Sequence, residues 1–409
     1  MSIKGPKFFY GYIVVAAAFV ILALAWGSNR TFGVFVEPML VEFGWTRGAI
    51  SGSFTISMLV MGVMALAAGR LTDSLGPRIV LVGCGLCLGL SYILTSRVQA
   101  LWEFYVFYGI IGGLGMSGFQ IPLMSVVVRW FRKRRSLMSG VLVAGVGLGN
   151  MVMPLVCSFL ISSLGWRFSY FLIGITVLGV ILSAAFFIRR DPADMGLSAY
   201  GSNQGALKGS ASQGTEYSLR EAMRTRQFWL INVVSFCDLF LITVVVVHIV
   251  IHSIDMQISG PRAASVLSLA AGISIPGRIV MGAVADRIGN RPALIFCLGV
   301  SVSAFFLLLF AENLGMLYLF AGLYGIGLWS TGAIISPLVA ELFGLKSHAT
   351  IFSFAVFMSA LGSASGPVIV GTLFDSTGSY QWAFILCLGI SLLAFLAGWL
   401  LRPLSEAEK

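Results

Sequence analysis

Residues 69–78 read GRLTDSLGPR, and residues 282–291 read GAVADRIGNR. Each stretch follows a long apolar segment, and both place Gly, Asp, Gly and Arg at the same relative positions. These residues are Gly69, Asp73, Gly76 and Arg78 in the first copy and Gly282, Asp286, Gly289 and Arg291 in the second. A motif that recurs at one fixed spacing of 213 residues predicts that the chain contains two copies of one structural unit.

The composition indicates the solvent in which these units fold. Hydrophobic residues make up 58% of the chain and charged residues only 10%, whereas about 25% of a typical soluble domain is charged. The apolar residues form segments that are long enough to cross a membrane as helices. Twelve are predicted, at residues 11–36, 48–70, 79–96, 101–127, 136–161, 167–188, 228–252, 263–285, 292–310, 314–339, 348–372 and 381–401. The expected fold is therefore an all-α membrane protein.

A polar stretch divides the twelve segments into two sets of six. Residues 189–227 are rich in Gly and Ser, which is typical of a flexible linker. Ser218 and Glu221 have the spacing of a capping box, which predicts a short surface helix. The expected domains are an N-terminal six-helix bundle (1–188), this cytoplasmic linker and a C-terminal six-helix bundle (228–409). Repetition in one orientation implies two pseudo-symmetric bundles with a site between them at mid-depth.

The basic residues predict the orientation of the chain. With the N-terminus inside, twenty Lys and Arg residues fall in cytoplasmic segments, against four in the outer loops, Arg47, Arg97, Arg167 and Arg262. The positive-inside rule then places both termini in the cytoplasm. The expected location is the cytoplasmic membrane, which is the inner or plasma membrane of the cell. Topology and attraction to anionic lipid headgroups account for the net charge of +10. We expect no nucleic-acid partner, because the basic stretch RWFRKRR (129–135) lies between two spans.

Nothing in the sequence indicates catalysis. All six cysteines lie in apolar segments, so no disulfide framework is expected. Cys84 and Cys87 form a CxxC on an apolar helix, where small packing residues are the ordinary interpretation rather than zinc or redox chemistry. With no nucleotide-binding loop and no soluble catalytic domain, we expect no enzyme activity, no metal and no cofactor, and transport driven by gradients.

Apart from charged residues at the span ends, three charged residues lie inside the predicted spans. Arg278 lies near the middle of GISIPGRIVMG (272–282) in the eighth span, where an arginine costs about 2.5–3.5 kcal/mol and should face protein or a water-filled cavity. Its guanidinium matches a carboxylate or phosphate, so the functional interpretation is an anion-binding residue. The alternative is a permanent salt bridge with Asp238 in the seventh span. Arg30 lies nearer the outer end of the first span, where it attracts a substrate or extends to the interface.

Over essentially its whole length the chain resembles the major facilitator superfamily. The two motif copies in corresponding loops carry this resemblance, and SALGSASGPVIVG (359–371) resembles the superfamily's Gly-Pro packing motif. The resemblance implies that the regions Asp73–Arg78 and Asp286–Arg291 latch the two halves in an outward-open state. The fifth span, with GVLVAGVGLGNMVMP (140–154), lacks the adjacent Gly-Pro of the superfamily's drug/proton antiporters, which weighs against multidrug efflux.

A narrower resemblance concerns the first and eighth spans. RTFGVFVEPMLVEFGWTRGAIS (30–51), together with Arg278, resembles the monocarboxylate transporter family and its prokaryotic relatives. That family generally carries lactate, pyruvate and similar short carboxylates with protons. The resemblance implies that Arg30 and Arg278 bind the carboxylate. The family often has an Asp four residues before the second arginine for the proton step, but this chain has Ser274, which leaves the proton mechanism less supported than carboxylate binding.

Further side chains are candidates for the same site. Asn29 is beside Arg30 and can donate a hydrogen bond. Walls for the apolar tail of a small carboxylate are expected from Phe119, Tyr324 and Trp329, and Gln120 is expected to face the same cavity. The proton candidates, in order, are Asp238, His248 at the outer end of the seventh span, and direct coupling through the arginine–carboxylate pair.

The expected function is proton-coupled transport of a monocarboxylate by alternating access, by a protein that works as a monomer. One alternative is an anion exchanger, for example of dicarboxylates, that uses both Arg30 and Arg278. A second is an exporter of drugs or other solutes, which would be indifferent to the loss of Arg278. A receptor or enzyme of similar fold would bind a ligand without moving it.

Overall fold

The computed structural model describes residues 9–202 and 216–402, and the chain divides into two compact units. Unit 1 is Met1–Thr215 and unit 2 is Glu216–Lys409. Among the described residues, 12 helices are long and apolar enough to cross a membrane. The predicted fold class, an all-α membrane protein with twelve spans, is therefore confirmed.

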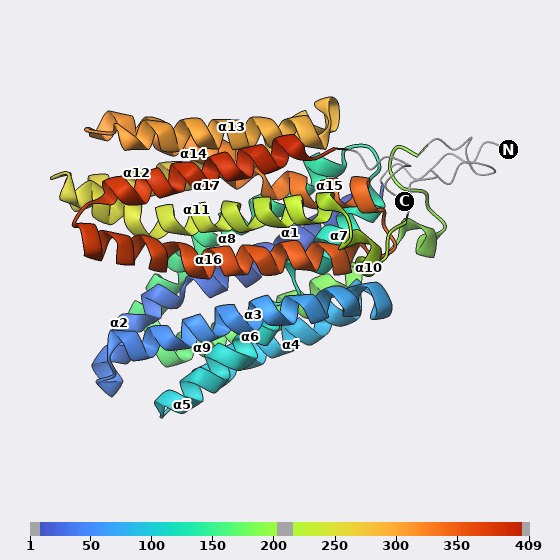
Figure 1. Ribbon diagram of the computed structural model, residues 1–409. Coiled ribbons are helices and arrows are strands. Elements are labelled where there is room, and N and C mark those ends of the chain that lie inside the picture. Colours follow the sequence, from blue (N-terminus) through green and yellow to red (C-terminus); the bar gives the residue numbers. More distant parts are fainter. Residues whose placement is uncertain (1–8, 203–215, 403–409) are drawn as a thin grey trace. The chain divides into compact units, whose positions relative to one another are not determined.

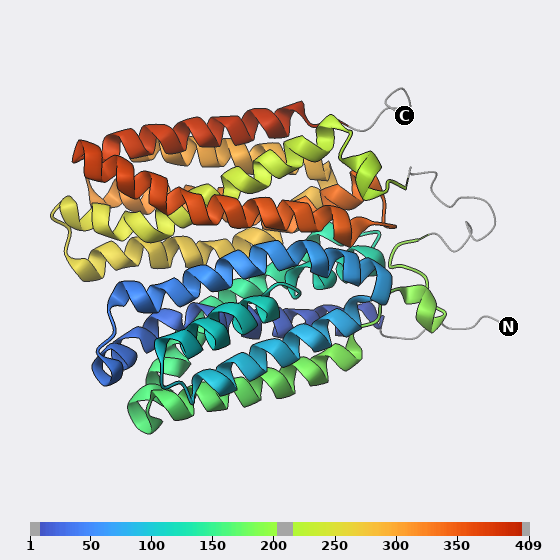
Figure 2. The ribbon, with the colours of Figure 1, turned by 60° about the horizontal axis from the view of Figure 1, so that its bottom comes forward.

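Six spans belong to unit 1, whose helices appear in blue to green in Figures 1 and 2. The first span joins α1 (Gly11–Arg30) to α2 (Phe32–Phe43) and is longer than predicted, because the backbone of Thr31 is itself helical, with φ −74° and ψ −8°. The remaining helices of unit 1 are α3 (Arg47–Leu75), α4 (Pro77–Thr95), α5 (Leu101–Phe104), α6 (Gly112–Met116), α7 (Gln120–Trp130), α8 (Arg135–Leu164) and α9 (Trp166–Phe187).

Unit 2 repeats the six-span pattern. Its helices are α10 (Leu219–Ala222), α11 (Arg226–Asp255), α12 (Gly260–Ile288), α13 (Asn290–Leu309), α14 (Leu314–Gly327), α15 (Gly332–Phe343), α16 (His348–Thr377) and α17 (Tyr380–Leu400). The long helices α11, α13, α16 and α17 run side by side (Figure 1). The apolar core of unit 2 includes Phe240 on α11, Phe305 on α13, and Phe320 and Tyr324 on α14.

The fourth and tenth spans are interrupted. The fourth, Leu101–Trp130, contains a π-helical turn at Tyr105–Ile111 and a break between α6 and α7. In the tenth, Leu314–Phe343, α14 ends at Gly327 and a 3₁₀ turn, Leu328–Ser330, precedes Thr331 and α15. Such interruptions are tolerated at membrane depth only where protein or a water-filled cavity surrounds the backbone.

The repeat also governs how helices pack within each unit. Gly149 on α8 lies against α1, and a Cβ there would overlap the carbonyl oxygen of Ala23. Gly362 on α16 is 213 residues later, and a Cβ there would overlap the carbonyl oxygen of Phe236 on α11. Both helix pairs therefore depend on a small residue at the same repeat position, as is usual for close packing in membranes.

Both described ends of the predicted linker contact the unit next to them. The backbone N–H of Tyr200 donates to the carbonyl oxygen of Trp130 at 2.9 Å. At the other end, the N–H of Tyr217 donates to the carbonyl oxygen of Phe343 at 3.1 Å. The predicted capping box is present, with the hydroxyl of Ser218 accepting from the N–H of Glu221 at the start of α10. The middle of the linker, 203–215, lies outside the described residues.

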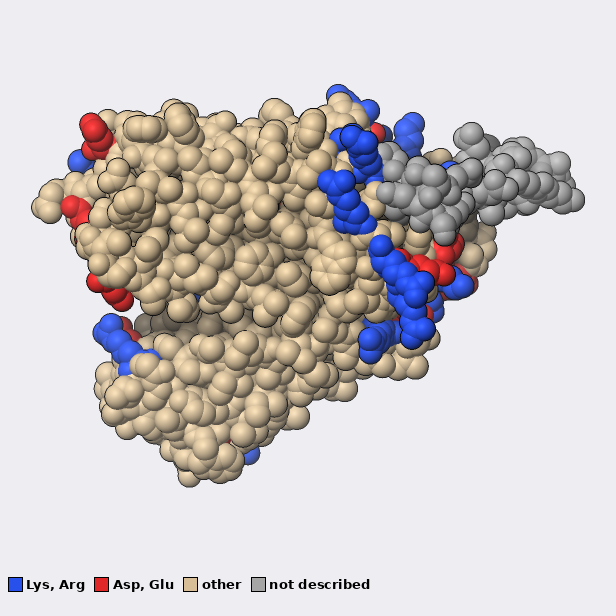
Figure 3. Space-filling model, viewed as in Figure 1, with Lys and Arg blue, Asp and Glu red and all other residues tan. Residues whose placement is uncertain are grey.

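Charged side chains gather at the helix ends in each unit. On the face drawn in Figure 3, the surface between these ends is almost entirely free of charge. Large apolar side chains are exposed within the spans, among them Leu59, Val63, Phe159 and Phe306. Exposed apolar surface of this extent is expected where lipid is the solvent.

Candidate functional site

Arg278 lies inside a span of unit 2, as predicted, and two contacts to one residue orient its guanidinium. It is on α12 with 7% of its surface exposed. Its Nε donates to the carbonyl oxygen of Trp329 at 3.1 Å, and its guanidinium carbon lies 5.2 Å from the centre of the Trp329 indole ring. A carbonyl acceptor and an aromatic face both suit a buried cation. Arg278 is therefore a buried positive charge within the membrane-spanning part of unit 2, in contact with Trp329.

Tyr324 lies behind this pair rather than on open surface. Its side chain is fully buried in the apolar core, and its hydroxyl donates to the carbonyl oxygen of Ile242 at 3.1 Å. It interacts electrostatically with Arg278. The ring of Trp329 is half-buried and packs edge-on against Tyr324. Of the two predicted wall residues in the tenth span, Trp329 is thus the one with accessible surface.

Asp238 is buried on α11, with 1% of its surface exposed. Neither of its carboxyl oxygens has a hydrogen-bond partner. The hydroxyl of Thr331 lies beside the carboxyl group but donates to the carbonyl oxygen of Leu328 at 2.7 Å. Asp238 forms no ion pair with Arg278, so the permanent salt bridge considered as the alternative role of Arg278 is absent.

His248 is held by two partners at the other end of α11. Its Nδ1 lies 3.2 Å from the hydroxyl of Tyr380, and its Nε2 lies 3.1 Å from the carbonyl oxygen of Pro367. A carbonyl only accepts, so Nε2 carries the proton and Nδ1 accepts from the tyrosine. A second proton on the ring would require Tyr380 to reverse its hydrogen bond. These contacts fit a structural link among α11, α16 and α17 better than a proton carrier.

Ser274 is one helical turn before Arg278 on α12. Its side chain is buried, and its hydroxyl donates to the carbonyl oxygen of Ala271 in its own helix at 2.8 Å. A hydroxyl does not take up or release protons near neutral pH. Asp238, on the neighbouring helix α11, is therefore the buried acid of unit 2 among the described residues.

The candidates in unit 1 have different environments. Arg30 is the last residue of α1, and its side chain is exposed. Asn29 is buried, and its side-chain oxygen has no hydrogen-bond partner. The hydroxyl of Tyr108 donates to the backbone carbonyl of Asn29 at 3.4 Å and interacts electrostatically with Arg30. Phe119 is fully buried, whereas Gln120 at the start of α7 is half-buried.

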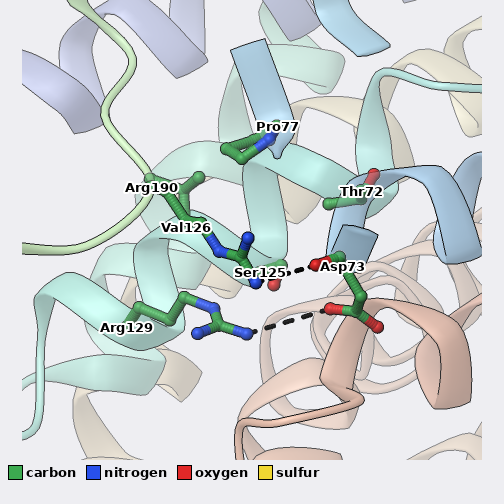
Figure 4. A pocket seen from close by; sticks show the side chains of 7 residues that line it. All are labelled: Thr72, Asp73, Pro77, Ser125, Val126, Arg129 and Arg190. Atoms are coloured by element: carbon green, nitrogen blue, oxygen red, sulfur yellow. Dashed lines mark hydrogen bonds and ion pairs between the residues drawn. The ribbon is translucent and has the colours of Figure 1, made fainter. Parts of the chain in front are cut away.

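The first motif copy lies in an ionic cluster (Figure 4). Asp73 is in the last turn of α3, and its carboxylate lies 3.8 Å from Nη2 of Arg129 on α7. Nη1 of Arg129 lies 3.4 Å from Asp191. Arg190 donates from Nη2 to the backbone carbonyl of Asp73 at 2.8 Å. A small pocket between these side chains is also lined by Thr72, Pro77, Ser125 and Val126.

Sequence reasoning missed the partners of Asp73. The sequence places Arg129 only in a basic stretch that indicates orientation, and Arg190 and Asp191 only in the linker. Arg78 of the motif instead stacks on Phe186, with its guanidinium carbon 4.5 Å from the ring centre. A basic residue at the end of the fourth span was the available signal for the ion pair.

The second motif copy has the same backbone conformation as the first, but its side chains have different partners. Gly76 and Gly289 both end a helix with positive φ, at 93° and 97°. Asp286 in the last turn of α12 is exposed. Arg291 donates from Nη2 to the carbonyl oxygen of Trp399 at 2.9 Å. Gly69 and Gly282 are buried within α3 and α12. The latch between the halves that the resemblance implies stays a prediction.

Comparisons with known proteins agree with this architecture. Residues 17–282 and 228–409 match the family model described as Major Facilitator Superfamily. Monocarboxylate transporter 13 of Rattus norvegicus is 26% identical over 94% of this chain and 87% of its own length. Monocarboxylate transporter 1 of Homo sapiens is 22% identical over 92% of this chain and 82% of its own length.

A solved structure gives the same result for the fold. The structure of the proton:xylose symporter XylE bound to 6-bromo-6-deoxy-D-glucose superposes with a TM-score of 0.79 over 95% of each chain, at 15% identity. At that identity the likeness concerns the fold alone. Because the family model covers most of the sequence and the structure has its spans, this integral membrane protein belongs to the major facilitator superfamily of transporters.

Proposed function

We propose that the protein is a secondary active transporter of small organic anions, with monocarboxylates such as lactate and pyruvate as its substrates. Transport is coupled to protons and proceeds by alternating access of the two units. The similarity to monocarboxylate transporters 13 and 1 supports this substrate class. The motif ends of the units face the cytoplasm of an inner or plasma membrane, as the distribution of basic residues indicates.

The observation that carries the proposal is the placement of Arg278. A guanidinium within a span is costly unless protein groups or a ligand compensate for it. The carbonyl and indole of Trp329 help to orient the group. The group presents Nη donors in a plane that matches a carboxylate. The half-buried indole supplies an apolar surface for a short carbon chain.

Arg30 has a secondary role in this mechanism. Its exposed position at the end of α1 suits attraction of an anion, with the amide of Asn29 and the hydroxyl of Tyr108 nearby. Asp238 is the proposed proton carrier, because protonation removes a charge that would otherwise be buried without a hydrogen-bond donor. His248 is the weaker candidate because both of its ring nitrogens are engaged.

The test is uptake of labelled L-lactate into proteoliposomes with a more acidic exterior. We expect Arg278→Gln to lower uptake at least about tenfold, because hydrogen bonds to charged groups contribute roughly 1.5–3 kcal/mol. Arg262→Gln is the matched control, since Arg262 lies exposed near the start of the same helix. Equal uptake by wild type and Arg278→Gln would refute the assignment of Arg278.

The same assay separates the alternatives. Uptake that requires an internal carboxylate and ignores the pH gradient would identify an anion exchanger instead of a proton-coupled carrier. The absence of carboxylate uptake under either condition would remove the substrate assignment, while the family membership would stand.

A further inference from the structure

The interruption of the tenth span lies between two buried charged groups of unit 2, and the following inference rests on the proposed function. The turn Leu328–Ser330 and Thr331 join α14 to α15. Arg278 contacts the middle residue of the turn, and Asp238 lies beside the residue that follows it. The candidate anion site and the candidate proton site therefore meet two residues of this connection, Trp329 and Thr331, which are two positions apart.

The contact on the arginine side is to the backbone. Because Nε of Arg278 donates to the carbonyl oxygen of Trp329, the direction of that peptide group fixes the plane of the guanidinium. The indole of the same residue lies against the guanidinium face. A change in the turn would thus reorient the donors that a carboxylate substrate needs.

On the aspartate side, the Thr331 hydroxyl can donate one hydrogen bond and has two acceptors beside it, the carbonyl oxygen of Leu328 and the carboxyl group of Asp238. The hydroxyl of Thr331 donates to the carbonyl oxygen of Leu328, which closes the turn. The carboxyl oxygens of Asp238 accept nothing. A buried carboxylate without a donor is costly, whereas a neutral carboxylic acid is less so. When Asp238 loses its proton to water, the carboxylate that remains is the stronger acceptor for the Thr331 hydroxyl.

The geometry points to Thr331 as the residue that couples proton binding at Asp238 to anion binding at Arg278. Loss of the proton moves the Thr331 hydroxyl from Leu328 to Asp238 and loosens the turn. The carbonyl of Trp329 then no longer holds the Arg278 guanidinium in its binding orientation. Because coupling between two binding sites is reciprocal, an anion at Arg278 also strengthens proton binding at Asp238. Thr331 is a positioning residue in this scheme and does not itself contact substrate.

The groups around Asp238 leave its carboxyl group as the one that titrates. Cys237 on the same helix, Cys297 on α13 and Tyr324 on α14 interact with it electrostatically. Cysteine and tyrosine side chains ordinarily keep their protons at neutral pH. Helices α12, α16 and α17 also pack on α11, and in the described part of the chain none of their charged side chains pairs with Asp238.

The first experiment compares net uptake with exchange for wild type, Thr331→Val and Thr331→Ser. Exchange of external for internal lactate needs no net proton release, whereas net uptake does. With one proton per anion, a gradient of one pH unit supports about tenfold accumulation. We expect Thr331→Val to keep exchange and to lose most of this accumulation, and Thr331→Ser to restore it. Thr243→Val is the control, because the Thr243 hydroxyl lies on the same helix as Asp238 and bonds to the backbone carbonyls of Leu239 and Phe240 and to that of Ser363 on α16, rather than to Asp238.

Two outcomes would overturn the coupling role. One is accumulation by Thr331→Val equal to wild type. The other is loss of exchange together with accumulation, since this would make Thr331 a general structural or substrate-binding residue.

A second experiment needs no substrate, so it stands even if lactate is not transported. The pH-dependent emission of Trp329 is obtained as the difference between wild type and Trp329→Phe. We expect a titration that disappears in Asp238→Asn and Thr331→Val and remains in Thr331→Ser. A titration of Trp329 that persists in Thr331→Val would refute the proposed link.

Discussion

The ends of the two units that carry the repeated motif are held together by different kinds of interaction. In unit 1, Asp73 and Asp191 flank Arg129, so side-chain charges connect α3, α7 and the segment after α9. In unit 2, the contacts at this end join one charged and one neutral group: Asn290 donates to the carboxylate of Glu341 at 2.9 Å, Arg291 donates to the carbonyl of Trp399, and Glu216 accepts from the N–H of Lys346 at 2.6 Å. The motif is the same, but its surroundings are not.

The contacts at the two motif ends differ because of residues outside the motif. The residue 213 positions after Arg129 is Leu342, so the second copy has no guanidinium at the corresponding place on α15. The repeated pattern of Gly, Asp, Gly and Arg thus specifies a backbone shape, while the neighbouring helices determine what the Asp contacts. Ion pairs between side chains weaken with salt, whereas side-chain bonds to uncharged backbone groups depend on it less.

The largest effect should come from the feature that the two ends share. Gly76 and Gly289 have φ of 93° and 97° with ψ near 155°, a region essentially restricted to glycine. Substitution by Ala at either site should lower the free energy of unfolding by about 1–3 kcal/mol. A Cβ at Gly76 would meet nothing within 4 Å, and one at Gly289 only Pro292 at 3.5 Å, so the two losses should be equal.

Thermal unfolding of the purified protein in detergent measures this effect. Gly83→Ala is the matched control, because Gly83 is within α4 and a Cβ there also meets nothing within 4 Å. That variant should be neutral or slightly more stable. If only one of the two motif variants is destabilised, the shared backbone shape is not what the motif specifies.

A smaller effect should distinguish the two ends. Asp73 and Arg129 expose 14% and 11% of their side chains, whereas Asp286 is exposed. Asp73→Asn should therefore cost about 1–2 kcal/mol, between the values for surface and buried pairs, and Asp286→Asn less. Thermal unfolding at low and high NaCl tests whether this loss of stability is electrostatic, because the loss caused by Asp73→Asn should then be smaller at high salt. Equal penalties for both variants would make the ionic cluster irrelevant to stability.

The sequence predicted what depends on local pattern. Segments free of charge predicted the twelve spans, the repeat predicted two similar units, and the spacing of Ser218 and Glu221 predicted the cap of α10. It did not predict the partners of Asp73, because Arg129 and Arg190 are 56 and 117 residues away and meet it only through helix packing. Similarly, the sequence did not predict the role of the Thr331 hydroxyl, because that role depends on Asp238, which lies on another helix and meets Thr331 only in the folded chain.

The smallest effect concerns the capping box of unit 2, where a carboxylate bonds to backbone. The N–H of Ser218 donates to Glu221 at 2.7 Å and its hydroxyl at 2.8 Å. These hydrogen bonds hold the pKa of Glu221 below its usual range. A carboxylate with a lowered pKa stabilises the fold above its unfolded pKa, and the contribution disappears as pH falls through the folded value.

Glu221→Gln should therefore be slightly less stable than wild type at pH 7, and the two should converge as pH falls below about 4, the ordinary range of glutamate. Thermal unfolding from pH 7 to pH 3.5 checks this, with Glu312→Gln as a control in the loop between α13 and α14. Because the donors are the N–H and hydroxyl of Ser218, added NaCl should leave the difference at pH 7 largely unchanged, in contrast to Asp73→Asn. A difference that salt removes would mean that Glu221 acts through surface charge, and that the two motif ends differ less than their contacts indicate.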